Sequence, residues 1–326
     1  MPDPGPPARA KVVAALLAVY IIWGSTYLGI RIVVETIPPF LSAGMRFSLA
    51  GGALYLIAKL QGAPSPSRES WKPAAITGGL LLLGGNGLVS WAEQSVPSSL
   101  TAILIAIVPL WVVVIDFALP GHLRPSQGVL AGIALGLVGV AILVDPWQAG
   151  VEHIEPVGAA VLIAASAIWS VGTIYGGRVK LKEAPLLVIG MEMLAGGLIL
   201  LAAGTLAGEW SAFDLGRVSQ RSALAFVYLV LVGAMVGFTA YLWLIKNVPP
   251  ALATTYAFVN PVVAIYVGWL VLAEPVTPRT LLAAAVIIAG VALITQARSR
   301  KSVPNMSAGG ALAGGTETSP LRGASK

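Results

Sequence analysis

Long apolar runs alternate with short polar connections along the chain. Ten runs reach about 20 mostly apolar residues, the length that a helix needs to cross the hydrocarbon core of a bilayer. They lie at 12–31, 39–60, 73–92, 97–118, 125–145, 156–176, 184–207, 222–245, 250–273 and 278–297. This pattern predicts an all-α, polytopic membrane protein with ten transmembrane helices.

The two terminal segments differ from the rest. The segment 1–11 is polar and proline-rich, and the run that follows is longer than a signal-peptide core and lacks a convincing cleavage site. We therefore expect a retained first helix. The tail 298–326, rich in Gly, Ala, Ser and Thr beyond Ser302, has too little apolar surface to order itself and is expected to be disordered.

Composition supports a lipid environment. Hydrophobic residues make up 57% of the chain and charged residues 10%, whereas soluble domains carry about 25% charge. The net charge of +6 falls in short loops between apolar runs, which is typical of membrane topology signals and not of a nucleic-acid surface.

Several kinds of chemistry are disfavoured by the residues that the chain lacks. There is no cysteine, and the two histidines, His122 and His153, fall in separate predicted loops. No Gly-Lys pair occurs, so there is no phosphate loop for ATP. We expect no metal, no cofactor and no enzymatic activity.

The distribution of Lys and Arg predicts the orientation. With the N-terminus in the cytoplasm, 15 of the 20 Lys and Arg residues fall inside and four outside, while Arg46 lies within a span. Such an excess of positive charge marks the cytoplasmic side. The sequence thus predicts a bacterial inner-membrane protein with both termini in the cytoplasm.

An internal repeat divides the chain into halves at 12–146 and 156–297, joined by an external linker at 147–155. The matches occur at offsets of 146, 152 and 151 residues: Trp23, Pro39, Gly44, Met45 and Arg46 with Trp169, Pro185, Gly190, Met191 and Glu192; Trp91, Val96, Pro97 and Pro109 with Trp243, Val248, Pro249 and Pro261; Gly139 with Gly290. Each half has five helices, an odd number, so the second half must be inverted. Inverted repeats are a recurrent transporter design, although a duplication that only builds a stable bundle is the alternative.

The repeated residues also carry a family resemblance. The chain resembles the EamA family of the drug/metabolite transporter superfamily over residues 12–297, through Trp23-Gly24-Ser25, Pro38-Pro39, Arg46, Asn260-Pro261-Val262 and Glu274. The resemblance implies two EamA repeats, cytoplasmic termini, a central cavity, and export or exchange of amino acids, metabolites or drug-like compounds.

Two charged residues lie deep in predicted spans. Arg46 is about 12 Å along its helix, and Glu192 holds the same place in the second half. Because a charge near the bilayer centre costs at least about 2.5–3.5 kcal/mol, we hypothesise that both face the central cavity, as a pair or as contacts for a zwitterionic solute. Glu192 is also a candidate proton carrier. The alternative is that each reaches an interface or anchors the structure.

Polar and aromatic residues complete the hypothetical solute pathway. The alternatives for them are helix packing and hydrogen bonds between helices. The residues are Trp23, Ser25, Tyr27, Asn86, Trp169, Tyr256 and Asn260.

Two further sets of residues concern helix geometry. Pro109 and Pro261 are candidate hinges, because proline removes a helical hydrogen bond. Gly128, Gly132 and Gly136 form a stripe for close packing, either between the halves or in a homodimer.

The sequence therefore predicts a secondary transporter, an exporter or exchanger of a small organic solute that works by alternating access. The alternative is a structural or sensory membrane protein without solute flux. A membrane enzyme is disfavoured because Glu192 is the only acidic residue found well inside a predicted span.

Overall fold

A computed structural model describes residues 9–118, 126–144, 155–248 and 256–301, and every regular element in these ranges is helical. The first half contains α1 (Arg9–Val33), α2 (Pro39–Leu60), α3 (Arg68–Gly78), η1 (Gly79–Gly87), α4 (Leu88–Ala92), α5 (Ser98–Ile105), α6 (Val108–Ala118) and α7 (Gln127–Val144). The second half contains α8 (Pro156–Arg178), α9 (Pro185–Leu206), α10 (Glu209–Ala212), η2 (Leu215–Arg217), α11 (Gln220–Tyr228), η3 (Leu229–Val236), α12 (Gly237–Asn247), α14 (Tyr256–Leu272) and α15 (Pro278–Lys301). Both histidines, the linker before Glu155 and the tail beyond Lys301 lie outside the described residues.

The described helices agree with the membrane interpretation. Seven helical segments are long and apolar enough to cross a bilayer, and shorter apolar helices cover Gln127–Leu143, Val259–Leu272 and Pro278–Ile294. The chain is therefore an all-helical membrane protein with two repeats of similar helices.

Helix starts follow local chemistry that recurs in both halves. Pro39 and Pro185 occupy the first turns of α2 and α9, where a missing N–H costs nothing. The hydroxyls of Ser67 and Ser219 accept hydrogen bonds from backbone N–H groups of α3 and α11. These caps fix where each crossing begins.

Three predicted spans are less regular than expected. The third and eighth contain the π-helical segments η1 and η3 at similar places in the two halves. The fourth divides into α5 and α6, because Pro109 in the first turn of α6 cannot donate to the carbonyl of Ile105. Pro261, in contrast, lies inside the continuous helix α14.

Helices α2 and α9 show that the two halves run in opposite directions. A Cβ added to Gly44 would lie 2.8 Å from Leu201, and one added to Gly190 would lie 2.7 Å from Tyr55. In the repeat, Gly190 corresponds to Gly44 and Leu201 corresponds to Tyr55. The two contacts are therefore equivalent and are related by a pseudo-two-fold axis. The helices are antiparallel, and the second half is an inverted copy of the first.

Helices α7 and α15 repeat this arrangement on the other side of the bundle. A Cβ on Gly132 would lie 2.6 Å from the carbonyl oxygen of Gly290, and one on Gly139 would lie 3.2 Å from that of Ala283. Gly128 and Gly132 of the predicted stripe thus pack against α15 of the other half, whereas a Cβ on Gly136 would meet Leu110 of α6. The sequence allows packing either between the halves or in a homodimer, and the described residues show packing between the halves.

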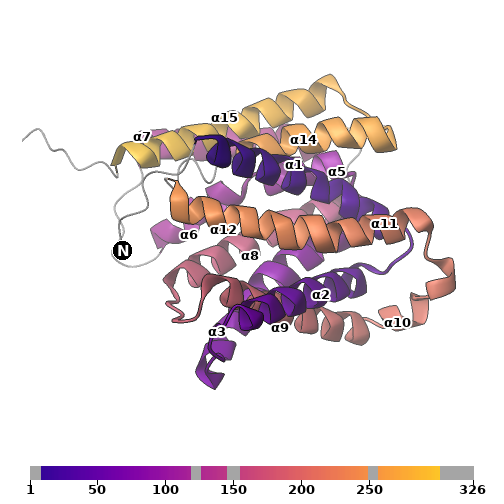
Figure 1. Cartoon of the computed structure of the whole chain (residues 1–326). Helices are drawn as coiled ribbons and strands as arrows, with labels where there is room; N and C mark the ends of the chain where they lie inside the picture. Colours follow the sequence, from indigo (N-terminus) through magenta and orange to yellow (C-terminus); the bar gives the residue numbers. More distant parts are fainter. Residues whose placement is uncertain (1–8, 119–125, 145–154, 249–255, 302–326) are drawn as a thin grey trace, which may run out of the picture.

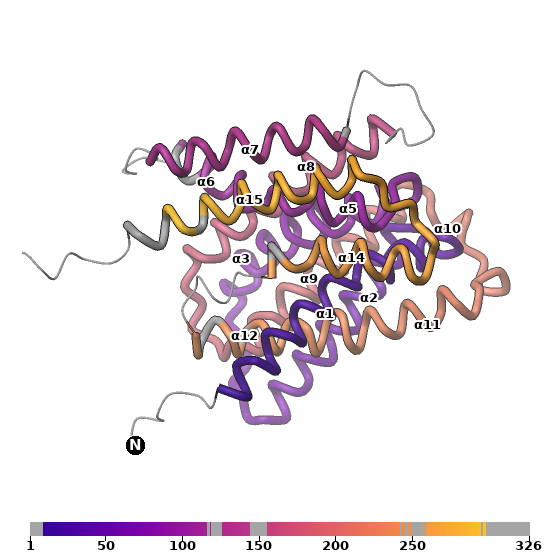
Figure 2. Tube along the Cα trace, turned by 90° about the horizontal axis from the view of Figure 1, so that it is seen from above, coloured from indigo at the N-terminus to yellow at the C-terminus, as the bar shows by residue number. Residues whose placement is uncertain are grey.

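The two pairs lie at opposite sides of the bundle, with α2 and α9 low and α7 and α15 high (Figure 1). Seen from above, α1 begins at the end near the N-terminus, whereas α8 begins at the opposite end (Figure 2). We call the end where α1 finishes and α2 begins the Val33 end, and the other the Lys59 end.

We expect the contact between α2 and α9 to tolerate no side chain at Gly51. A Cβ there would lie 2.5 Å from the backbone nitrogen of Leu194, while one on the adjacent Gly52 meets no atom within 4 Å. Gly51→Ala should lower stability by about 1–3 kcal/mol through overpacking. Gly52→Ala should leave it unchanged or raise it by up to about 1 kcal/mol, since alanine favours helix. Thermal unfolding of both purified variants in detergent checks this, and equal melting temperatures would contradict the assigned packing.

Candidate functional site

A cluster of buried and half-buried polar side chains of the first half lies towards the Val33 end. Three adjoining elements bring it together. Tyr27 and Arg31 come from the last turns of α1, Arg46 from the second turn of α2, and Glu93 directly follows α4. Its members are far apart in sequence and are gathered only by the packing of α1, α2 and α4.

Arg46 is only 4% exposed and uses its guanidinium within the protein. Its Nη2 donates to Oδ1 of Asn86 at 2.9 Å, and its Cζ lies 4.1 Å from the ring centre of Phe47. Nε has no hydrogen-bond partner among the described residues. A buried arginine with one donor free can bind an anionic group.

A cavity of about 10 Å³ adjoins Arg46, the size that holds one water molecule. Its wall combines hydroxyls of the first half with apolar side chains of the second. The lining includes Ser42, Arg46, Ser90, Phe226 and Leu229. The space therefore lies at the contact between the halves and is polar on one side.

Glu93 is the most unusual group of the cluster. Its side chain is 0% exposed, and neither carboxylate oxygen has a hydrogen-bond partner in the described part of the chain. Arg31 and Arg46 are the positive groups near enough to act on its charge, and Glu274 is the negative one. An arginine N–H of Arg31 donates to the backbone carbonyl of Glu93, not to its carboxylate.

Two carboxylates of the second half cap helices of the first half at the Val33 end. Glu274 accepts hydrogen bonds from the backbone N–H groups of Ser98 at 2.8 Å and Ser99 at 3.0 Å, at the start of α5. Glu209 accepts from those of Phe40 at 3.2 Å and Leu41 at 2.8 Å, at the start of α2. Helix N-termini favour negative charge, so each cap fastens the halves together at this end.

At the Lys59 end the halves also meet through a carboxylate. The hydroxyl of Ser70 in α3 donates to Glu183, which lies in the connection between α8 and α9. This hydrogen bond holds the pKa of Glu183 below its ordinary value.

Glu192 does not join the cluster. Arg46 bonds to Asn86, and no ion pair joins it to Glu192 among the residues described. The backbone carbonyl of Glu192 instead packs against Gly78 of α3. The hypothesised pairing of these two residues is therefore not formed in this structure.

Trp23 and Trp169 take equivalent packing positions. A Cβ on Gly237 would lie 2.6 Å from Nε1 of Trp23, and one on Gly85 would lie 2.5 Å from Cε3 of Trp169. Gly237 is the repeat counterpart of Gly85, so each tryptophan covers the third crossing of the opposite half. Of the two roles weighed for this pair, packing is the one seen in these contacts.

The other predicted pathway residues divide between the cluster and its surroundings. Tyr27 lies close to Glu93. Asn86 holds Arg46, as described above. The hydroxyls of Ser25 and Tyr228 are 2.6 Å apart, and Tyr256 packs edge-on against Trp23. Asn260 is buried, and its Oδ1 has no partner among the described groups.

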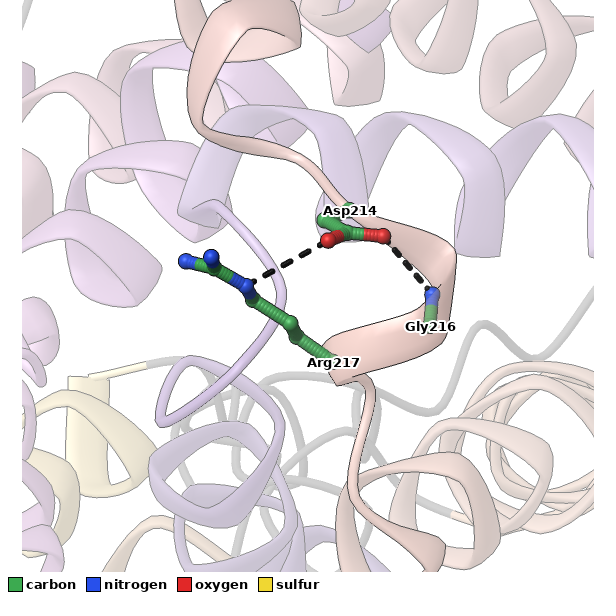
Figure 3. A network of polar contacts seen from close by, with 3 residues as sticks. All are labelled: Asp214, Gly216 and Arg217. Carbon is green, nitrogen blue, oxygen red and sulfur yellow. Dashed lines mark hydrogen bonds and ion pairs between the residues drawn. The ribbon is translucent and has the colours of Figure 1, made fainter.

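One ion pair lies elsewhere, in an exposed turn between α10 and α11 (Figure 3). Arg217 Nε is 3.3 Å from Asp214 Oδ2, and their side chains are 87% and 58% exposed. Such a pair contributes little to stability. It is a useful contrast to the buried charges of the cluster.

Comparisons with known proteins agree with this architecture. The EamA-like transporter family matches residues 10–145 and 156–296, one copy for each half. "Uncharacterized inner membrane transporter YedA" of Escherichia coli (strain K12) is 41% identical over 283 residues, covering 86% of this chain and 89% of that protein.

More distant similarities cover most of the chain as well. "Probable terminal-alkyne amino-acid exporter" of Streptantibioticus cattleyicolor is 26% identical and spans 88% of this chain and 94% of its own length. "Probable amino-acid metabolite efflux pump" of E. coli (strain K12) is 24% identical, spanning 91% and 98%. A crystal structure with 20% identity has the same fold, with a TM-score of 0.59, covering 91% of this chain and all of that one. The chain belongs to the EamA-like transporter family and is a multi-pass inner-membrane transporter.

Proposed function

We propose that the chain is a secondary transporter that exports or exchanges a small organic solute by alternating access. The observation that carries this proposal is the position of the Arg46 cavity. Its wall combines residues of the first half, such as Arg46 and Ser90, with Phe226 and Leu229 of the second. Relative motion of the halves would change the size and the opening of this space.

The symmetry of the contacts supports alternating access. In an inverted repeat, each half can adopt the conformation of the other, and exchanging the two conformations opens a central site to the opposite side. Helices α2 and α9 form a contact that this exchange leaves equivalent, because Gly44 and Gly51 of α2 have the counterparts Gly190 and Gly197 in α9 across the pseudo-two-fold axis.

The cavity is too small for an organic solute in the present conformation. About 10 Å³ holds one water molecule, so solute would enter after one end of the bundle opens. Opening at the Val33 end would have to release the caps that Glu274 and Glu209 form on α5 and α2. Opening at the Lys59 end would have to release Ser70 from Glu183.

Arg46 indicates the chemistry of the solute. Its free Nε and its position on the cavity suit a carboxylate or another anionic group. Relatives named as amino-acid exporters and efflux pumps are consistent with a solute that carries a carboxylate. Both hinge prolines, Pro109 and Pro261, remain candidates for the points where helices bend.

The alternative function is structural or sensory, without solute flux. It predicts a rigid bundle in which the Arg46 cavity never opens. A membrane enzyme is a weaker alternative, since the buried cluster combines two arginines with carboxylates and offers no histidine or cysteine among the described residues.

Orientation follows from the charges. We expect ten crossings with both termini in the cytoplasm, which places the Val33 end outside and the Lys59 end inside. Because the chain has no cysteine, the exposed residues Gln94 and Gln61 offer matched single-cysteine variants at the two ends. In intact cells an impermeant maleimide should label Gln94→Cys and leave Gln61→Cys unlabelled until the cells are broken. The reverse pattern would contradict the orientation.

Transport itself is tested by counterflow in proteoliposomes. We expect purified protein loaded with an unlabelled amino acid, sugar or cationic drug to accumulate the labelled form of at least one of them. Arg46→Gln should reduce this exchange at least about tenfold, the effect of losing roughly 1.4 kcal/mol of solute binding.

The control for that variant is Arg217→Gln, which removes an arginine from the exposed turn and should leave exchange unchanged. Exchange that is absent for every solute of the panel would speak for the structural alternative. An equal loss of exchange in Arg46→Gln and Arg217→Gln would contradict a specific role of Arg46 in the solute pathway.

A further inference from the structure

We infer that Glu93 is a proton-exchange site and that the proton is the ion coupled to transport. Only the coupling of this proton to transport rests on the proposed function. The site itself stands on the surroundings of one carboxyl group.

Glu93 has no exposed surface, and both its oxygens are without hydrogen bonds in the described structure. A buried charge needs partners, and an unpartnered carboxylate is costly. In contrast, Glu274 and Glu209 occupy their oxygens with backbone N–H groups, so neither has a similar vacancy.

Charged neighbours act on Glu93 in opposite directions. Arg31 and Arg46 favour the ionised form of Glu93, whereas burial and Glu274 favour the protonated form. These opposing influences allow the carboxyl group to gain and lose a proton as its surroundings change. The titratable and charged groups on the elements around it are Tyr27 and Arg31 of α1, Arg46 of α2, Glu155 before α8, Tyr228 of α11 and Glu274 after α14.

Most of these neighbours already have hydrogen-bond partners other than the Glu93 carboxylate. Tyr228 shares a hydrogen bond with Ser25, and Glu155 accepts from the N-terminus of its own helix. Arg46 is held by Asn86. No neighbour in the described residues donates to the carboxylate oxygens of Glu93, so a proton is the cation that fits there without extra space.

The two repeats differ at the position of Glu93. The segment from Trp91 to Pro97 matches Trp243 to Pro249, and Glu93 aligns with Ile245. The acid therefore exists in one half and near one end of the bundle. A proton site of this kind would meet water only when the Val33 end opens, which is the condition for coupling proton release to the conformation.

Infrared difference spectroscopy tests the site directly and needs no known solute. Purified protein in liposomes is titrated between acidic and alkaline pH, and the carbonyl stretching band of protonated carboxylic acids is recorded. We expect a band that disappears reversibly at high pH in the wild type. It should be lost in Glu93→Gln and retained in Glu35→Gln, a variant of an exposed acid at the same end.

Two further variants keep the test decisive. Glu93→Asp retains a carboxyl group and should shift the midpoint of the band, which decides the matter if Glu93→Gln does not fold. Glu192→Gln should remove only the contribution of Glu192 itself and leave the component that belongs to Glu93 unchanged. The assignment would be overturned if that component persists in Glu93→Gln or keeps its midpoint in Glu93→Asp. It would also be overturned if that component is lost in Glu192→Gln instead. A lack of solute flux in the wild type would count against the proposed function and leave this titration unaffected.

Discussion

The structure depends on the close antiparallel contact of corresponding helices from the two halves. Glycines of α2 meet α9, and glycines of α7 meet α15, with each contact repeated across a pseudo-two-fold axis. Little hydrophobic drive acts between helices in lipid, so close backbone approach through small residues supplies much of their association. These two contacts hold the halves in register and leave the space between them for α1, α5, α8 and α14 (Figure 1).

On this symmetric scaffold, the charges are arranged asymmetrically. Arg46 of the first half corresponds to Glu192 of the second, and Glu93 corresponds to Ile245. The buried cluster therefore has no copy at the Lys59 end. A symmetric scaffold makes the two conformations of a transporter similar in energy, while an asymmetric cluster can make one of them sensitive to solute or protons.

The sequence predicted the repeat because Trp, Pro and Gly occupy positions where few other residues fit. The α2–α9 glycines and the Trp23 and Trp169 contacts show what those residues do. The π-helical segments could not be predicted, since no residue type specifies them. The sequence predicts a hinge at Pro109, but it does not predict that one helix ends and another begins near this residue.

The sequence pattern does not single out Glu93, because this residue lies one position beyond the predicted span 73–92 and is expected in a loop. Its burial arises from the packing of α4 against α8 and α2, which no local pattern reveals. The pairing of Arg46 with Glu192 was inferred from equal depth, yet equal depth does not place two side chains on facing surfaces. A signal for Glu93 was available in the repeat, which aligns an acid with an isoleucine.

In the proposed mechanism, the two ends of the bundle open in alternation. Spin labels on Gln94→Cys and Leu215→Cys measure the gap between the halves at the Val33 end, and labels on Gln61→Cys and Lys182→Cys measure it at the other end. On addition of a solute that supports counterflow, one distance should lengthen while the other shortens. Distances that stay fixed, or that lengthen together, would contradict alternating access.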